Sequence, residues 1–116
     1  MNYLIILNDP PYGTERSYNG LRLASSLAKD EEMSLSVFLI GDAVWCAAAG
    51  QTTPNGYYNI ERMLKFLASK NHKVGVCGSC MDARGIKPEA IAEGAHRSSM
   101  DELTAWTKAA DKVIVF

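Results

Sequence analysis

The feature that most constrains the fold is the alternation of short apolar segments with helical patterns. Four apolar segments rich in Val, Ile and Leu occur at 3–7, 35–40, 73–76 and 112–116, and a weaker one lies near 94–96. The segments are mostly unbroken, which is typical of strands that are buried on both faces of a parallel sheet. We therefore expect a parallel sheet, with the C-terminal segment paired into it.

Helical patterns fill the gaps between these segments. The clearest covers 57–70, a second covers 14–29, and a shorter helix is expected after Gly41, where Asp42 is predicted to cap it. Ser99 precedes Glu102 by three residues, which predicts a capping-box start for a further helix. Strands that alternate with helices predict βαβ units and an α/β fold, a three-layer α/β/α sandwich. The turn-rich segment 50–56 is expected to be a mobile surface loop.

Length and composition limit the classes of protein. The 116 residues match the usual size of one domain, so we expect a single domain over 1–116. The net charge of −1 gives no support to sequence-independent nucleic-acid binding, and no apolar run approaches the roughly 20 residues of a membrane span. The N-terminus lacks a basic region of the kind that begins a signal peptide, so a cytoplasmic protein with reduced thiols is expected.

The candidate chemistry lies in a pair of cysteines. Cys77 directly follows the apolar segment 73–76, so it is expected at the carboxyl end of a strand, where sites gather in parallel sheets. If a helical turn follows, its partial positive charge favours the thiolate, and Arg84, Arg97 or Arg16 would lower the thiol pKa further if near. A thiolate is the nucleophile that takes sulfur from a donor and holds it as a persulfide. The competing interpretation is a small buried apolar residue.

With Cys80, Cys77 forms a CxxC motif that has three interpretations. It is a dithiol that forms and breaks a disulfide, a zinc half-site, or a sulfur carrier in which the second cysteine is optional. The zinc interpretation requires two further ligands, and the only candidates are Cys46, His72 and His96. Cys46 is expected in the core, His72 at the surface, and His96 in a loop, either solvated or as an acid or base.

Several motifs, in this order and spacing, resemble the DsrE/DsrF-like (YchN-like) sulfur-relay family over essentially the whole chain. They are the opening strand with Asn8-Asp9-Pro10-Pro11-Tyr12-Gly13-Thr14-Glu15-Arg16, the segment 38–44, the segment Val76-Cys77-Gly78-Ser79-Cys80-Met81-Asp82-Ala83-Arg84-Gly85-Ile86, and the tail from Gly94 to Phe116. The resemblance implies a mainly parallel five-stranded sheet between helices and an oligomer, often a trimer or hexamer. It also implies that Cys77, eight residues before Gly85, takes up persulfide sulfur and passes it between protein partners.

The first hypothesis is therefore a sulfurtransferase-like persulfide carrier in which Cys77 receives the sulfur and Cys80 either assists or releases the product by forming a disulfide. It requires a sulfur donor protein and an acceptor protein, but no cofactor, metal, nucleic acid or membrane. Two alternatives stay open. One is a non-catalytic oligomeric binding module of the same fold, and the other is a CxxC dithiol redox protein.

Overall fold

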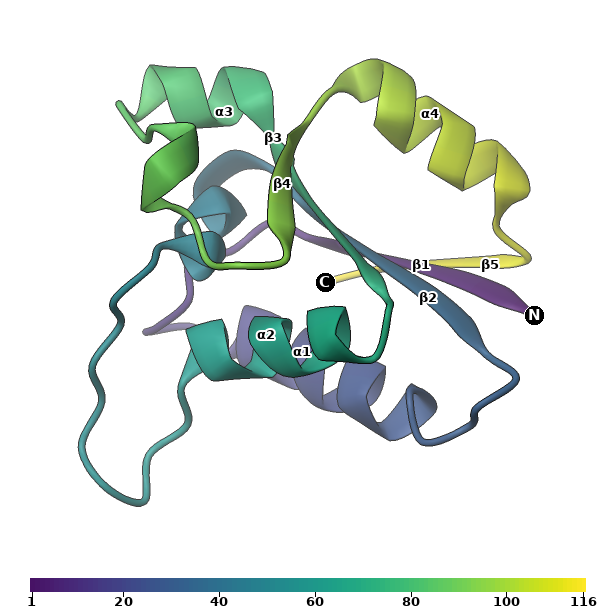
Figure 1. Ribbon diagram of the computed structural model, residues 1–116, viewed down its shortest axis with the longest axis horizontal. Coiled ribbons are helices and arrows are strands. Elements are labelled where there is room, and N and C mark those ends of the chain that lie inside the picture. The colour runs from purple at the N-terminus through teal and green to yellow at the C-terminus, as the bar shows by residue number, and fades with distance from the viewer.

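A five-stranded sheet with the strand order β4-β3-β2-β1-β5 organises the chain (Figure 1). The computed structural model describes all residues, 1–116. Every neighbouring pair of strands is parallel, as the apolar pattern predicts. The strands are β1 (Asn2–Leu7), β2 (Ser34–Leu39), β3 (Lys73–Cys77), β4 (Ala95–Ser98) and β5 (Lys112–Val115).

Helices cover both faces of the sheet, which confirms the three-layer α/β/α sandwich. Helices α1 and α2 lie side by side on one face, and α4 lies on the other (Figure 1). The α-helices are α1 (Arg16–Leu27), α2 (Ile60–Ser69), α3 (Gly78–Ala83) and α4 (Met100–Ala109), and the 3₁₀ helices are η1 (Gly41–Ala47) and η2 (Pro88–Ala90). No helix has the length and apolar character needed to cross a bilayer.

The central strands are buried as expected, whereas the edge strand β5 is not. Leu4 and Ile5 of β1 and Val37 and Phe38 of β2 have at most 1% of their surface exposed. In β5, however, Val113 is 43% and Val115 61% exposed. The prediction of burial on both faces is therefore wrong for β5, because α4 leaves this edge of the sheet uncovered.

The C-terminal residues are nevertheless tied into the sheet. Strand β5 pairs with β1, and beyond it the Phe116 amide donates to the Ile6 carbonyl at 2.9 Å. The Asn8 amide in turn donates to the Phe116 carbonyl at 3.1 Å. The predicted pairing of the C-terminal segment is confirmed.

The helix starts agree with the sequence in one case and differ in another. Ser99 precedes α4 and its hydroxyl accepts from the Glu102 amide at 3.2 Å, which confirms the serine cap. The second half of the predicted capping box is not formed, because the Glu102 carboxylate accepts from the Ser98 hydroxyl and pairs with His96. Asp42 does not cap η1, so that prediction is wrong. The residue at the cap position is Ile40. The Asp42 carboxylate instead accepts a hydrogen bond from the Arg84 guanidinium, and such a bond between charged groups is stronger than one to a backbone amide.

Candidate functional site

Cys77 lies where β3 ends and α3 begins, at the carboxyl edge of the sheet (Figure 1). Strand β4 runs beside it, with Ser98 as the register partner of Cys77. The next residue must be glycine, because a Cβ at Gly78 would lie 2.8 Å from the Ser98 carbonyl oxygen and 2.8 Å from the Arg97 Cζ. Gly78 therefore allows β4 and its arginine to approach the cysteine motif closely.

Polar groups surround the Cys77 sulfur and favour its thiolate. The sulfur lies 3.4 Å from the Ser79 hydroxyl oxygen. Burial by itself raises the pKa of Cys77, but hydrogen bonds from the Cys80 and Ser79 side chains and from their backbone amides outweigh it, so the pKa lies below its ordinary value of 9.0. Cys77 is thus the more acidic thiol of the motif.

Cys80 keeps its proton because of the same pairing. Burial, followed by the hydrogen bond to the Cys77 sulfur, raises the pKa of Cys80, and the Cys77 charge acts in the same direction. Two groups oppose this shift: the Gly41 amide, which donates to the Cys80 sulfur at 3.2 Å, and the positive charge of Arg84. When the pair loses one proton, the negative charge therefore resides on Cys77 and the remaining proton on Cys80.

Two of the three candidate arginines lie at the motif. The Arg84 guanidinium donates to the Cys80 carbonyl at 3.1 Å and to Asp42 at 2.8 and 3.2 Å. The Arg97 guanidinium donates to the Gly78 carbonyl at 3.1 Å and forms a bidentate ion pair with the Asp82 carboxylate, at 2.8 and 2.9 Å.

Each of these arginines thus forms an ion pair with an aspartate. The third candidate, Arg16, has a side chain that is 72% exposed and pairs with Asp9 instead, at 3.5 Å. The pKa of Cys77 is accordingly lowered mainly by hydrogen bonds and not by an unpaired cation.

The Cys77 thiol is less accessible than a position at the rim of the sheet suggests. The residue has 5% of its surface exposed, whereas Cys80 is half-buried. The sulfur has the Ser79 hydroxyl and the Cys80 thiol as polar neighbours, but Cys77 is also part of the buried apolar core. Of the two thiols, Cys80 is therefore the more exposed.

The other sequence candidates lie away from this pair or have other roles. Cys46 is fully buried, its sulfur lies 3.6 Å from the Asp9 carbonyl, and burial raises its pKa to about 12, which confirms the core interpretation. His72 is half-buried and not freely exposed, and burial lowers its pKa. His96 belongs to strand β4 and not to a loop, and its ring pairs with the Glu102 carboxylate.

The family assignment rests on the whole chain. The model of the DsrE/DsrF-like family matches residues 1–116. The chain belongs to the DsrE/DsrF-like family. Protein YchN of Escherichia coli K12 is 40% identical over 114 residues, which cover 97% of each chain. The crystal structure of the E. coli ychN protein superposes with a TM-score of 0.91 at 38% identity, covering all of both chains.

A second relative of this DsrE/DsrF-like chain has a more specific name. Sulfurtransferase TusD of Buchnera aphidicola (strain 5A) is 30% identical over 128 residues, covering 100% of each protein. Both the family resemblance inferred from the motifs and the expected fold are thereby confirmed.

The zinc interpretation of the CxxC motif lacks the ligands it requires. Nowhere in this DsrE/DsrF-like chain do three His, Cys, Asp or Glu side chains come together in a way that could hold a metal ion. Cys46, His72 and His96 do not complete a site around Cys77 and Cys80, and His96 is already paired with Glu102.

Four residues that shape the site could not be chosen from the motif alone. Ser79 was visible as the middle of the CxxC, but its contact with Cys77 depends on the helical turn. Gly41, Asp42 and Asp82 act through contacts between segments that are distant in sequence or on separate elements. The one available signal is that Gly41 and Asp42 follow β2, whose carboxyl end lies next to that of β3.

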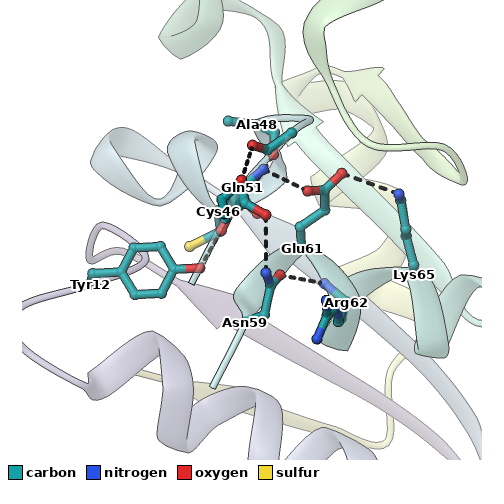
Figure 2. Close-up of polar contacts among 10 residues, drawn as sticks. Tyr12, Cys46, Ala48, Gln51, Asn59, Glu61, Arg62 and Lys65 are labelled. Atoms are coloured by element: carbon teal, nitrogen blue, oxygen red, sulfur yellow. Dashed lines mark hydrogen bonds and ion pairs between the residues drawn. The ribbon is translucent and has the colours of Figure 1, made fainter. Parts of the chain in front are cut away.

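A separate polar cluster anchors the loop that precedes α2 (Figure 2). The Gln51 side-chain amide donates to the carbonyls of Cys46 and Ala48 at 2.9 Å each, and the Gln51 backbone amide donates to the Glu61 carboxylate at 2.8 Å. The Tyr12 hydroxyl donates to the Gln51 side-chain oxygen at 2.6 Å. These bonds hold one end of the segment predicted as a mobile loop and fix the C-terminal end of η1, the helix whose first residue contacts Cys80.

Proposed function

We propose that this protein is a sulfur carrier in a relay, with Cys77 as the residue that holds the sulfur. The observation that carries the proposal is the thiol pair at the end of β3, in which hydrogen bonds hold the pKa of Cys77 below its ordinary value. At neutral pH a larger fraction of Cys77 than of an ordinary cysteine is thiolate, and the thiolate is the form that attacks sulfur. Membership of the family and the relative named sulfurtransferase TusD support the same role.

The transfer consists of two exchanges. The Cys77 thiolate attacks the outer sulfur of a donor persulfide, R–S–SH. A bond forms between Cys77 and that sulfur, the donor S–S bond breaks, and the donor leaves as R–S⁻. An acceptor thiolate then attacks the outer sulfur of Cys77–S–SH, and Cys77 leaves as a thiolate.

The groups around Cys77 suit both its attack and its departure. The Ser79 hydroxyl, at 3.4 Å, and the hydrogen-bonding Cys80 thiol stabilise negative charge on the Cys77 sulfur. A stabilised thiolate is a better leaving group, because the leaving rate rises as the thiol pKa falls. The same contacts therefore assist the delivery of sulfur to the acceptor.

The donor and the acceptor are proposed to be protein thiols that dock at the Cys80 side of α3. The three free cysteines suit a reducing compartment, so we assign the carrier to the cytoplasm. The exposed Val113 and Val115 on β5 suit an interface between copies of the chain, in a trimer or hexamer. Light scattering at micromolar concentration tests this assembly, and a monomeric mass contradicts it.

The proposal is tested by weighing the intact protein after incubation with a low-molecular-weight persulfide donor. The Cys80→Ser protein is expected to gain one sulfur atom, about 32 Da, and the Cys77→Ser protein to gain none. Cys46→Ser is the matched control, since Cys46 is fully buried and its loss is expected to leave sulfur uptake unchanged. No gain in Cys80→Ser, or an undiminished gain in Cys77→Ser, contradicts the assignment. That result would favour the alternative function, a non-catalytic oligomeric binding module of the same fold.

A further inference from the structure

We infer that Cys80 is a resolving thiol that cleaves the Cys77 persulfide, so that the carrier can release its sulfur as hydrosulfide and end as a Cys77–Cys80 disulfide. This inference rests on the proposed function, since it requires sulfur on Cys77. It adds a second fate for the sulfur and a second substrate class, a dithiol reductant that restores the two thiols.

The first argument is the placement of the two sulfurs. Cys77 immediately precedes α3 and Cys80 lies three residues later, within its first turn. Residues at this spacing lie on the same side of a helix. Each thiol shifts the pKa of the other, which is consistent with two neighbouring sulfurs at the start of one short helix.

The second argument is that contacts from another element hold Cys80 and favour negative charge on it. The Gly41 amide donates to its sulfur at 3.2 Å. Gly41 adopts a φ of 61°, a left-handed conformation that favours glycine. Arg84 bonds to both the Cys80 carbonyl and Asp42, which ties the start of η1 to α3. Cys46 lacks this arrangement, because burial raises its pKa to about 12 and no arginine opposes that shift.

The third argument is that loading of sulfur changes the balance between the thiols. Before loading, negative charge on the Cys77 sulfur raises the pKa of Cys80 and so favours its protonated form. When Cys77 carries a persulfide, its charge moves to the outer sulfur, one bond further out. The Gly41 amide and Arg84 stay where they are, so Cys80 loses its proton more readily once the carrier is loaded. Cys80 is therefore a weaker nucleophile in the empty carrier, where its thiol keeps its proton, and a stronger one in the loaded carrier.

The step balances as an internal exchange: Cys77–S–S⁻ plus Cys80–SH gives Cys77–S–S–Cys80 plus HS⁻. The Cys80 sulfur bonds to the inner sulfur of the persulfide, the bond to the outer sulfur breaks, and the Cys80 proton leaves with the outer sulfur. That sulfur takes up two electrons, which the two cysteines give up as they form the disulfide. A dithiol reductant then returns two electrons and two protons to the pair.

The experiment follows the mass of the intact protein and the release of sulfide with time, without oxygen, after addition of one equivalent of a low-molecular-weight persulfide. Wild type is expected to lose about 2 Da, the mass of two hydrogens, and to release about one equivalent of sulfide. Cys80→Ser is expected to keep its gain of about 32 Da and to release sulfide at least about tenfold more slowly. Cys46→Ser is the matched control and should behave as wild type, and peptide mapping should locate the disulfide between Cys77 and Cys80.

The possible failures are distinguishable. If Cys80→Ser gains sulfur and wild type also keeps it, with neither disulfide nor sulfide, the resolving role is overturned while the carrier role stands. A wild-type disulfide without sulfide indicates direct oxidation and likewise overturns it. If no variant gains sulfur, the carrier role fails and the resolving role fails with it. Cys80→Ala, which removes the polar atom, guards against a serine that alters Cys77 by hydrogen bonding.

Discussion

The three cysteines are predicted to differ widely in reactivity, and an alkylating reagent at pH 7 measures the difference. Burial raises the pKa of Cys46 to about 12, so its thiolate fraction at pH 7 is on the order of 10⁻⁵. The pKa of Cys77 lies below 9.0, so its thiolate fraction is above about 10⁻². The ratio of the two thiolate populations is at least about a thousandfold.

Intrinsic nucleophilicity reduces this ratio without reversing it. A thiolate of lower pKa is less reactive, with a Brønsted slope of about 0.4–0.5 for thiol exchange, so a difference of about three pKa units costs Cys77 roughly thirtyfold. The remaining preference for Cys77 is at least about thirtyfold. The complete burial of Cys46 increases it, because the chain must open before the reagent can reach that sulfur.

The assay is peptide mapping after timed exposure to iodoacetamide, over pH 5 to 10. In the wild-type protein the rate at Cys77 should rise about tenfold for each pH unit and level off below pH 9.0, since its pKa is lowered. Fragmentation of the labelled peptide distinguishes Cys77 from Cys80. Native Cys46 should stay unlabelled while Cys77 is consumed. Labelling of Cys46 as fast as Cys77, or a Cys77 rate that is still rising at pH 10, would refute the description of the thiol pair.

Three further predictions concern stability, each measured by urea unfolding. Glu61→Gln should cost about 1–3 kcal/mol at pH 7 by weakening the bonds to Gln51, and it should reduce the loss of stability on acidification. Burial raises the pKa of Glu61, but its hydrogen bonds outweigh burial and hold the pKa below 4.5. The ionised Glu61 therefore stabilises the fold above pH 4.5, and this stabilisation is lost as the pH falls through the pKa of Glu61 in the folded protein. An acid response that is the same in Glu61→Gln as in wild type contradicts this prediction. Gly75→Ala should cost about 1–3 kcal/mol, because the new Cβ would lie 2.9 Å from the Trp106 ring, and an unchanged midpoint would show that the ring moves freely. Gly78→Ala should cost a similar amount and also slow sulfur uptake, because its Cβ would lie 2.8 Å from the Ser98 carbonyl oxygen, and uptake at the wild-type rate counts against a role for this close approach.

The fold could be predicted well because its signals are local. The unbroken apolar segments determine the strands, and the Ser99 cap of α4 depends on residues three apart, so both are readable from short stretches of sequence. The exposure of Val115 could not be predicted, since it depends on which strand becomes the edge of the sheet and where α4 crosses.

The position of the candidate site could be predicted from the sequence, but the partners that set the pKa values of its thiols could not. The position of Cys77 follows from the strand that it ends. Its partners were less accessible to sequence reasoning, because the Gly41 amide that contacts Cys80 is 39 residues away and the partner of Arg84, Asp42, is 42 residues away. Asp42 also illustrates competition between two favourable uses, a helix cap and an ion pair, which only the folded chain decides.

The central claim is that the first sulfur atom taken up resides on Cys77. The most direct measurement loads Cys80→Ser from a persulfide with an isotopically labelled outer sulfur, traps the product by alkylation, and maps the label by tandem mass spectrometry. We expect the label on the peptide that carries Cys77, with none on Cys46. A label on Cys46, or a Cys77 that alkylates without any labelled sulfur, would contradict the account.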